Sequence, residues 1–332
     1  MAQEGILVTG GAGYIGSHVV RQLGEAGHRV VVLDNLSTGF KEAVLHGELI
    51  IGNTGDQALV SRILKEQEIG AVMHFAANIV VPESVSDPMK YYGNNTCNTR
   101  NLLDCCQKAG ISHFIFSSTA AVYGIPETLP VSEETPVSPI NPYGTSKLMS
   151  EWMLRDLAAA SELRYVILRY FNVAGANVEG QIGQSTPEAT HLIKVACEVA
   201  TGAREQVAIF GTDYPTEDGT GVRDYIHVDD LASAHLKALD YLRNGGDSTT
   251  LNCGYGSGFS VREVLDTVAE CHGSPLKIVE QPRRAGDPPA LIAAASKIRE
   301  TLGWQPQHNN LRLIAQTALD WEKKIQQKKA GR

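Results

Sequence analysis

The sequence predicts an α/β protein, with a Rossmann-type doubly wound parallel sheet and a smaller α/β substrate domain after it in the chain. Three observations predict this class. Apolar strand-like segments alternate with helical segments, a glycine-rich turn follows the first strand, and the strand-like segments are unbroken apolar runs. Strands that are apolar on both faces need cover from both sides, so we expect helical layers above and below the sheet.

Length and composition are compatible with this class. The chain has 332 residues, 43% of them apolar, and a formal net charge of −8. This charge makes a broad nucleic-acid or anionic-membrane surface unfavourable, and no apolar run approaches the ~20 residues that span a bilayer. The six cysteines show no paired spacing, which is typical of reduced thiols. We therefore expect a cytoplasmic protein with no nucleic-acid and no membrane partner.

The first half of the chain alternates strands and helices in successive βαβ units. Strands are expected at 5–9, 29–33, 49–51, 71–75, 113–117 and 165–168, and helices at 14–26, 57–67, 95–108 and 143–160. Crossovers of this kind join parallel strands.

The alternation loosens after Phe171. Helices are expected at 188–201, 229–244, 260–271 and 311–324, loops at 177–187 and 211–221, and a solvated, frayed helix end at 323–332. We divide the chain into a first domain at 1–172 and a smaller region at 173–332. The assignment of the segment around 224–245 stays open, because this segment could also pack back on the first domain.

A glycine-rich turn joins the first strand to the first helix. Gly10, Gly13 and Gly16 permit a tight turn, close approach of a pyrophosphate to backbone N–H groups, and close packing of helix on strand. Asp34 closes the second strand 18 residues after Gly16. A carboxylate there accepts hydrogen bonds from both ribose hydroxyls of adenosine and repels a 2′-phosphate, so the pattern favours NAD over NADP.

Tyr143 and Lys147 are four residues apart at the start of an expected helix, so their side chains share one face. A phenol with a pKa of about 10 is a weak base at neutral pH. A nearby ammonium, or the positive nicotinamide ring of an oxidised cofactor, stabilises the phenolate and lowers that pKa. Thr119 ends an apolar strand in a run of hydroxyls, where a doubly wound sheet holds its substrate.

With these residues, the chain resembles the extended short-chain dehydrogenase/reductase family, and within it the UDP-glucose 4-epimerases, over nearly its whole length. The similar runs of the first half lie at 10–16, 34–36, 74–77, 83–85, 91–96, 121–124 and 169–172. The runs at 214–220, 223–231 and 283–287 are the more specific to the epimerases.

The resemblance implies an NAD-dependent isomerase that interconverts UDP-glucose and UDP-galactose through a transient 4-keto sugar, with no net redox change. Tyr143 is expected to take the proton of the sugar 4-hydroxyl while hydride passes from carbon 4 to tightly bound NAD. Thr119 is expected to hydrogen-bond the same oxygen, and Lys147 to hold the nicotinamide ribose and lower the pKa of Tyr143. The resemblance also implies a homodimer, built through the helices at 95–108 and 143–160.

The resemblance implies two sets of binding residues. Those expected to bind NAD are Gly10, Gly13, Tyr14, Ile15, Gly16, Asp34, Asn35, Leu36, Ser37, Thr38, Gly39, Asn53, Thr54, Phe75, Ala76, Ala77, Ile79, Asn95, Tyr143, Lys147, Tyr170 and Phe171. Those expected to bind the UDP-sugar are Thr119, Tyr143, Asn172, His191, Leu192, Ala208, Phe210, Arg223, Tyr225, Arg284, Asp287 and Leu291.

The resemblance also implies roles for residues of the second set. Arg223 and Arg284 are expected to neutralise the diphosphate with their forked donors, without a metal. Asn172 is expected to contact a phosphate, and Asp287 the uridine ribose. A small apolar group, Leu192, Ala208 and Phe210, is expected to line the uracil pocket.

Four positions depart from the family pattern. Asn53 stands where an aspartate usually bonds the adenine, and His191 where an asparagine is common. Ile79 stands where some epimerases have a lysine near the cofactor. Leu291 replaces a tyrosine found in some relatives, and the smaller wall leaves room for an N-acetyl group, so UDP-N-acetylglucosamine is expected as a further substrate.

Other functions remain open at the level of the sequence. Within the same family these are uronate or pentose epimerisation, decarboxylation and dehydration of a nucleotide sugar; Ser118-Thr119-Ala120 lacks the acidic pair that dehydration needs. A redox-inert NAD-binding sensor is the rival from another class. The ten histidines show no metal-ligand spacing, and no nucleophile elbow is present, so no metal site is expected.

Overall fold

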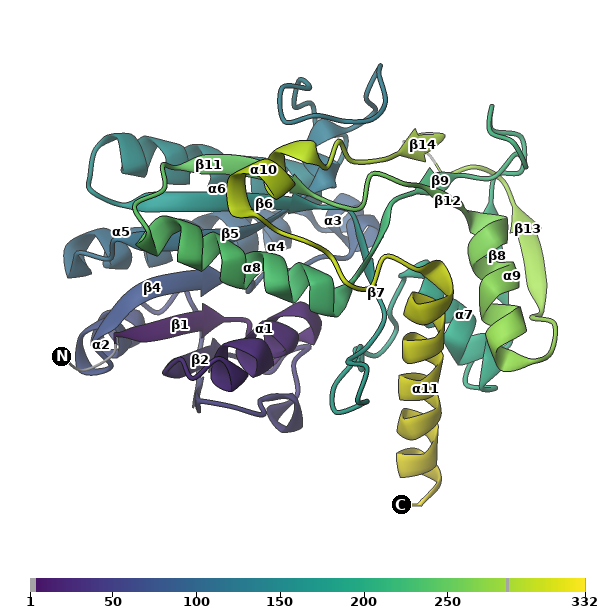
Figure 1. Cartoon of the computed structure of the whole chain (residues 1–332), viewed down its shortest axis with the longest axis horizontal. Coiled ribbons are helices and arrows are strands. Elements are labelled where there is room, and N and C mark those ends of the chain that lie inside the picture. Colours follow the sequence, from purple (N-terminus) through teal and green to yellow (C-terminus); the bar gives the residue numbers. More distant parts are fainter. Residues whose placement is uncertain (1–3, 285–286, 332) are drawn as a thin grey trace.

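The computed structural model describes residues 4–284 and 287–331, and a seven-stranded sheet forms its centre (Figure 1). The strands lie in the order β11-β6-β5-β4-β1-β2-β3, and all neighbours are parallel. Their bounds are β1 Gly5–Thr9, β2 Val30–Asp34, β3 Glu48–Ile51, β4 Ile69–His74, β5 His113–Thr119, β6 Arg164–Tyr170 and β11 Thr249–Cys253. The predicted doubly wound sheet is confirmed.

Helices cover both faces of the sheet. On one face lie α1 Tyr14–Glu25 and α8 Val228–Arg243, and on the other α2 Gln57–Glu66, α5 Asn98–Ala109 and α6 Pro142–Ala159. Ile6 and Val8 of β1 pack into the core beneath α1 and α8, whereas Leu7 packs into the core beneath α2, α5 and α6. Every residue of the strand is therefore buried, which explains the unbroken apolar run in the sequence.

The later part of the chain adds three small sheets and further helices at the right of Figure 1. The strands are β7 Asn172–Ala174, β8 Val207–Phe210, β9 Val222–Arg223, β10 Tyr225–His227, β12 Phe259–Ser260, β13 Ile278–Gln281 and β14 Ala290–Leu291. The helices at the right are α7 Leu192–Ala200, α9 Val261–His272 and α11 Leu311–Ala330, whereas α10 Ser296–Leu302 lies beside β11 and α8. Ile193, Val264 and Ile314 from these helices belong to the same apolar core as β1.

Several elements differ from the sequence prediction. The expected helix at 95–108 begins as a π-helical segment, η2 (Tyr92–Cys97), and continues as α5. The short helices α3 (Val81–Ser86) and α4 (Pro88–Tyr91) and the strands of two to five residues after Phe171 are not expected, because such short segments show no measurable periodicity. The C-terminal segment, expected to fray from residue 323, continues as α11 to Ala330; Arg332 lies outside the described residues.

The carboxyl ends of the parallel strands gather the predicted site residues along one edge of the sheet. Asp34 ends β2, Phe75 follows β4, Thr119 ends β5 and Tyr170 ends β6. This is the edge at which open α/β sheets bind their ligands. No helix in the part of the chain that the structure describes is long and apolar enough to cross a membrane.

Candidate active site

The glycine-rich turn leaves a cradle at the start of α1. Gly10 has φ +72°, and a Cβ at that position would lie 2.6 Å from the Ala76 nitrogen. At Gly16 a Cβ would lie 2.2 Å from the Gly10 carbonyl oxygen, so this glycine allows α1 to approach the turn closely. Gly13 caps α1 without any side-chain hydrogen bond to the first turn. The first N–H groups of the helix are thus available to an anion, as a dinucleotide pyrophosphate requires.

Asp34 is buried beside this cradle. Its Oδ2 accepts the Ala12 N–H at 2.9 Å and its Oδ1 the Leu36 N–H at 2.8 Å, so the carboxylate is held against the turn. The segment 35–39, which contains the predicted Asn35, Ser37, Thr38 and Gly39, leads from this carboxylate to Phe40, whose N–H donates to the Ala12 carbonyl at 2.9 Å. The structure therefore brings together the turn, Asp34 and the following loop, in a form that fits an adenosine ribose and pyrophosphate.

The other predicted cofactor residues form two groups. Some lie beside the glycine-rich turn, and others hold neighbouring elements together. Phe75, Ala76 and Ala77 are half-buried directly after β4, next to Gly10. Asn95 is almost fully buried, and its side-chain amide hydrogen-bonds the Asn78 backbone and the Ser146 hydroxyl. These contacts fix the loop after β4 against α6. Ile79 is 48% exposed in the same loop.

The remaining cofactor residues are also placed by local contacts. The Tyr14 hydroxyl donates to the Gly175 carbonyl at 2.6 Å, and the half-buried Ile15 packs against the core. Asn53 is exposed and its Oδ1 accepts the Gly55 N–H at 2.7 Å, while Thr54 is buried. Tyr170 hydrogen-bonds the Ser117 hydroxyl, and Phe171 lies in a separate small core.

Thr119, Tyr143 and Lys147 meet at the end of β5. Tyr143 lies in the first turn of α6, which Asn141 caps by accepting the Gly144 N–H at 2.8 Å. Burial raises the pKa of Tyr143, and a hydrogen bond with the Thr119 hydroxyl lowers it in part. Thr119 is thus the described residue that favours the phenolate, whereas the sequence predicts that role for Lys147.

Lys147 is buried one helical turn further on. Its Nζ lies 4.4 Å from the centroid of the Phe116 ring. Burial lowers the pKa of Lys147 to about 7, against the opposite effect of the Glu151 carboxylate. The ammonium is therefore sensitive to its charged neighbours.

A buried polar group that the sequence did not predict lies behind these residues, and we call it the inner charge cluster: Ser118, Tyr123, Glu151, Arg169 and Asn252. Arg169 donates to both carboxylate oxygens of Glu151, at 2.9 and 2.6 Å. It also donates to the Tyr123 hydroxyl at 3.0 Å, which in turn donates to Asn252 at 2.7 Å. The available signal was a glutamate four residues after Lys147, on the same face of one helix.

A second charged group lies between β9 and the segment before β14, and we call it the outer charge cluster: Arg223, Arg284 and Asp287. Arg223 Nη2 lies 3.6 Å from Asp287 Oδ1, and the Arg284 guanidinium carbon lies 3.7 Å above the Phe210 ring centroid. Leu291 of β14 is in register with Arg223 of β9, which places it beside the cluster. Ala285 and Gly286 of the same run lie outside the described residues.

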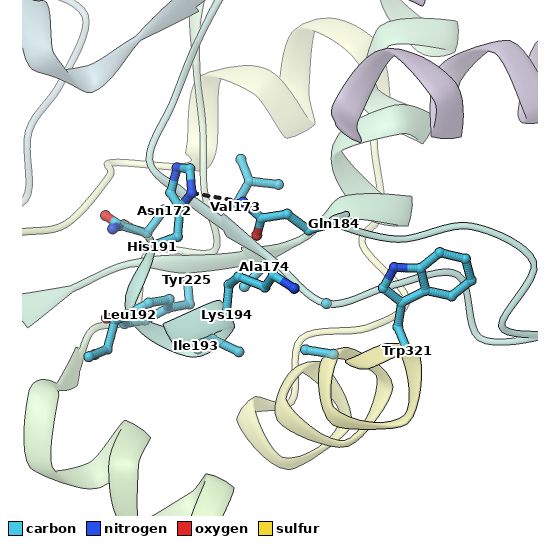
Figure 2. A pocket seen from close by; sticks show the side chains of 12 residues that line it. Asn172, Val173, Ala174, Gln184, His191, Leu192, Ile193, Lys194, Tyr225 and Trp321 are labelled. Carbon is cyan, nitrogen blue, oxygen red and sulfur yellow. Dashed lines mark hydrogen bonds between the residues drawn. The ribbon is translucent and has the colours of Figure 1, made fainter. Parts of the chain in front are cut away.

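Four further predicted substrate residues border a small pocket (Figure 2). Asn172, His191, Leu192 and Tyr225 line it together with side chains from α7 and α11. His191 Nδ1 lies 2.9 Å from the Gln184 amide nitrogen, and burial lowers its pKa, which favours the neutral imidazole. Ala208 and Phe210 lie on β8.

Metal chemistry finds no support in the described residues. Within 4–284 and 287–331, no three His, Cys, Asp or Glu side chains are grouped so that they could hold a metal ion.

Comparison with known proteins is consistent with this geometry. The model of the NAD dependent epimerase/dehydratase family matches residues 6–254. A UDP-glucose 4-epimerase from Azospirillum brasilense is 56% identical over 327 residues, which cover 98% of this chain and 94% of that protein.

Two solved structures are similar over almost their whole length. UDP-glucose 4-epimerase from Brucella ovis in complex with NAD is 44% identical with a TM-score of 0.93, covering 96% of this chain and 98% of that chain. The UDP-Glc/GlcNAc 4-epimerase from Campylobacter jejuni is 51% identical with a TM-score of 0.86, covering 97% of this chain and 99% of that chain.

Proposed function

The chain belongs to the NAD dependent epimerase/dehydratase family, and we propose that it is an NAD-dependent isomerase that reversibly epimerises a UDP-hexose at carbon 4. The observation that carries this proposal is the meeting of Thr119, Tyr143 and Lys147 at the same sheet edge as the Gly10–Gly16 turn and Asp34. A base at that edge lies where a doubly wound sheet holds a substrate against a dinucleotide.

The residues present fit NAD. The uncapped start of α1 suits the pyrophosphate, and Asp34 suits the adenosine ribose and disfavours a 2′-phosphate. We propose that the other predicted residues of the turn, the 35–39 loop and the Phe75–Ala77 wall complete this site. When bound, oxidised NAD would supply the acceptor, and then the donor, of a hydride at carbon 4 of the sugar, and a positive charge that favours the Tyr143 phenolate.

The side chains of this site have distinct parts in the reaction. We propose that Tyr143 takes the proton of the sugar 4-hydroxyl as the hydrogen of carbon 4 leaves as hydride, and returns the proton to the same oxygen when hydride adds back to the opposite face of carbon 4. Thr119 hydrogen-bonds that oxygen and orients it, and Lys147 holds the nicotinamide ribose through its ammonium. Because the site is buried, water is kept from the transient 4-keto sugar.

The UDP part of the substrate is assigned to the outer charge cluster and its surroundings. Arg223 and Arg284 neutralise the diphosphate, Asp287 accepts from the uridine ribose, and Asn172 contacts a phosphate. We propose that Leu192, Ala208 and Phe210 contact the uracil; Leu192 borders the pocket with His191 and Tyr225, and Ala208 and Phe210 lie on β8. Leu291 leaves more room beside Arg223 than a tyrosine would, so the substrates extend to UDP-N-acetylglucosamine.

We propose that residues 1–172 bind NAD and that 173–332 bind the UDP-sugar. α8 returns to the sheet and packs on α1, which supports assigning the segment around 224–245 to the first part. All six cysteines are free thiols, which favours a reducing compartment such as the cytoplasm.

We also propose that the protein forms a homodimer through α5 and α6. Met149 and Trp152 of α6 are exposed apolar side chains, and Val85 and Met89 are exposed on α3 and α4, which contact α6. Sedimentation should give the mass of a dimer, and Trp152→Glu should shift it toward the monomer. A monomeric wild-type protein at micromolar concentration contradicts this proposal.

The reaction is tested by incubating the purified protein, without added NAD, with UDP-galactose, UDP-N-acetylgalactosamine or UDP-xylose and separating the products. We expect UDP-glucose from the first and the 4-epimer of the acetylated sugar from the second. Conversion of UDP-xylose alone would identify a pentose epimerase instead. Turnover of UDP-galactose with none of the acetylated sugar would overturn the role of Leu291.

A further inference from the structure

A fully buried carboxylate lies behind the catalytic residues. Glu151 has no exposed surface, and Arg169 is 2% exposed. Arg169 binds both oxygens of Glu151, and the Ser118 hydroxyl donates to Glu151 Oε1 at 2.6 Å. Arg155, which is partly exposed, adds a contact of 3.2 Å. A carboxylate with this many donors in a dry site is held firmly in one position.

The partners of Glu151 stand next to the catalytic residues on three elements. Glu151 follows Lys147 by one helical turn on α6. Ser118 precedes Thr119 at the end of β5. Arg169 precedes Tyr170 at the end of β6 and is in register with Asn252 of β11. One carboxylate therefore ties the helix that carries the base to the strand that carries its hydroxyl partner.

The surroundings of Lys147 give Glu151 a second role. On α6 itself, Tyr143 precedes Lys147 and Glu151 follows it by one helical turn, and β5 contributes the Phe116 ring. β4 contributes His74, whose pKa burial lowers to about 3, with a further lowering from Lys147, so it is neutral. On β6, Arg169 and Tyr170 are in register with Ser118 and Thr119 of β5, and burial is the main cause that raises the pKa of Tyr170.

Glu151 is the described carboxylate that stabilises the charge of Lys147, in addition to the contact with the Phe116 ring. Tyr143 and Tyr170 are neutral phenols around pH 7, because burial raises the pKa of both. Glu151 is the described group that raises the pKa of Lys147, against the larger lowering by burial. Arg169 neutralises part of the same carboxylate, so it limits what Lys147 receives.

We propose that Glu151 is a positioning residue of the proposed epimerase, which fixes Thr119 against Tyr143 and keeps Lys147 an ammonium, with Arg169 setting the strength of the second effect. This inference rests on the proposed function. It assigns to a buried ion pair an electrostatic role in addition to its structural one. The two roles predict different results when each partner is removed.

The test is the pH dependence of kcat with UDP-galactose, in which the alkaline limb reports loss of the Lys147 proton. Glu151→Gln leaves Arg169 unneutralised near Lys147, and we expect the limb to move to lower pH by about one unit. Arg169→Met removes the closer of the two arginines and leaves the carboxylate less neutralised, with Arg155 still in contact, and we expect the limb to move to higher pH. Arg164→Met, an exposed arginine at the other end of β6, should leave the profile unchanged.

A structural role alone predicts that both variants lose activity or stability while the limb stays where it is, because both break the same ion pair. That result, or a shift of both limbs in one direction, overturns the proposal. If either single variant does not fold, the double variant Glu151→Gln, Arg169→Gln avoids an unpaired buried charge. We expect its limb to lie below that of the wild type, and an unchanged limb contradicts the proposal.

The wild-type measurement separates this proposal from the proposed function. A wild-type protein that does not convert UDP-galactose contradicts the function itself. A wild-type protein that turns over, with variants whose limbs do not move in opposite directions, contradicts only the role assigned to Glu151.

Discussion

The inner and outer charge clusters pair arginine with carboxylate in opposite ways. In the inner cluster, Arg169 and Glu151 are buried and joined by two hydrogen bonds of 2.9 and 2.6 Å. In the outer cluster, Arg223 and Asp287 lie 3.6 Å apart, and the Asp287 side chain is 41% exposed. In the inner pair, the hydrogen-bonding groups of Arg169 and Glu151 are occupied by each other and by neighbouring side chains. In the outer pair, hydrogen-bonding groups of Arg223 and Asp287 stay available to a ligand.

The difference follows from what each cluster must do. A site that moves a proton in a dry interior needs its charges fixed beforehand, because any reorganisation would add to the barrier. A site that captures a diphosphate from water needs arginines whose hydrogen bonds are still available. Changes in the inner region should therefore affect turnover or stability, and changes in the outer region should affect binding.

The largest effect is expected at Tyr143. Tyr143→Phe removes the only proposed base, so kcat should fall by roughly 10²- to 10⁴-fold, while NAD and UDP still bind. Turnover is measured with UDP-galactose and UDP affinity by titration calorimetry. The control is Tyr165→Phe, at the amino end of β6, which should keep wild-type kcat. A Tyr143→Phe enzyme within tenfold of the wild type would remove the base from the mechanism.

Arg284→Ala should act on binding alone. The loss of a charged hydrogen bond to the diphosphate should raise KM by roughly 10- to 100-fold. The unfolding midpoint should stay the same, because the Arg284 side chain is exposed and its contact is with the Phe210 ring. Arg283→Ala is the matched control, since Arg283 is already occupied by Asp213 and the Tyr214 ring. Equal effects of the two variants would argue against a specific role for Arg284.

Asn252→Ala should show the reverse pattern. Asn252 is fully buried, accepts from Tyr123 at 2.7 Å and donates to the Val131 carbonyl at 2.9 Å. Leaving these groups unpaired should lower the free energy of unfolding by about 1–3 kcal/mol, with KM nearly unchanged. Urea denaturation measures the loss, and the exposed Asn309→Ala is the control. A rise in KM as large as that of Arg284→Ala would erase the contrast between the clusters.

The smallest effect is expected at His308, outside both clusters. The pKa of His308 is raised, and its hydrogen bond with Asp230 is the main cause. Burial opposes this effect in part. Because the folded pKa lies above the unfolded value of about 6.5, the stabilisation is complete below pH ~6.5 and is lost as pH rises through the folded pKa.

His308→Gln should therefore lower the free energy of unfolding at pH 5.5, by less than about 1 kcal/mol, and not at pH 9. Urea denaturation of both proteins at the two pH values checks this. The neighbouring His227, whose pKa burial lowers to about 4, has the opposite pH dependence and is present in both proteins. A deficit that grows from pH 5.5 to pH 9 would reverse the assigned sign.

Local spacing made part of this site predictable from the sequence. The Gly10–Gly16 turn, Asp34 and the pair Tyr143 and Lys147 each lie within one βαβ unit or one helical turn, so sequence distance translates directly into geometry. For the same reason the longer strands and helices of the first half were predicted to within a few residues, whereas the short helices α3 and α4 were not predicted.

Tertiary pairings made the rest unpredictable. Glu151 and Arg169 are 18 residues apart on different elements, and only the packing of α6 against the sheet brings them together. Arg223 and Asp287 come together through the pairing of β9 with β14. Strands of two residues are too short to be predicted from the sequence. The weak acidity of the Tyr143 phenol also depends on burial, which the sequence does not give residue by residue.

The most direct test of the central claim follows the hydrogen at carbon 4 of the sugar. UDP-galactose deuterated at carbon 4 is converted in ordinary water without added NAD, and the UDP-glucose formed is analysed by mass spectrometry. We expect the deuterium to stay at carbon 4, because the sugar is inverted inside one closed site with no net redox change. Loss of the label to solvent would mean that carbon 4 exchanges a proton with water, and would contradict the mechanism proposed for Tyr143.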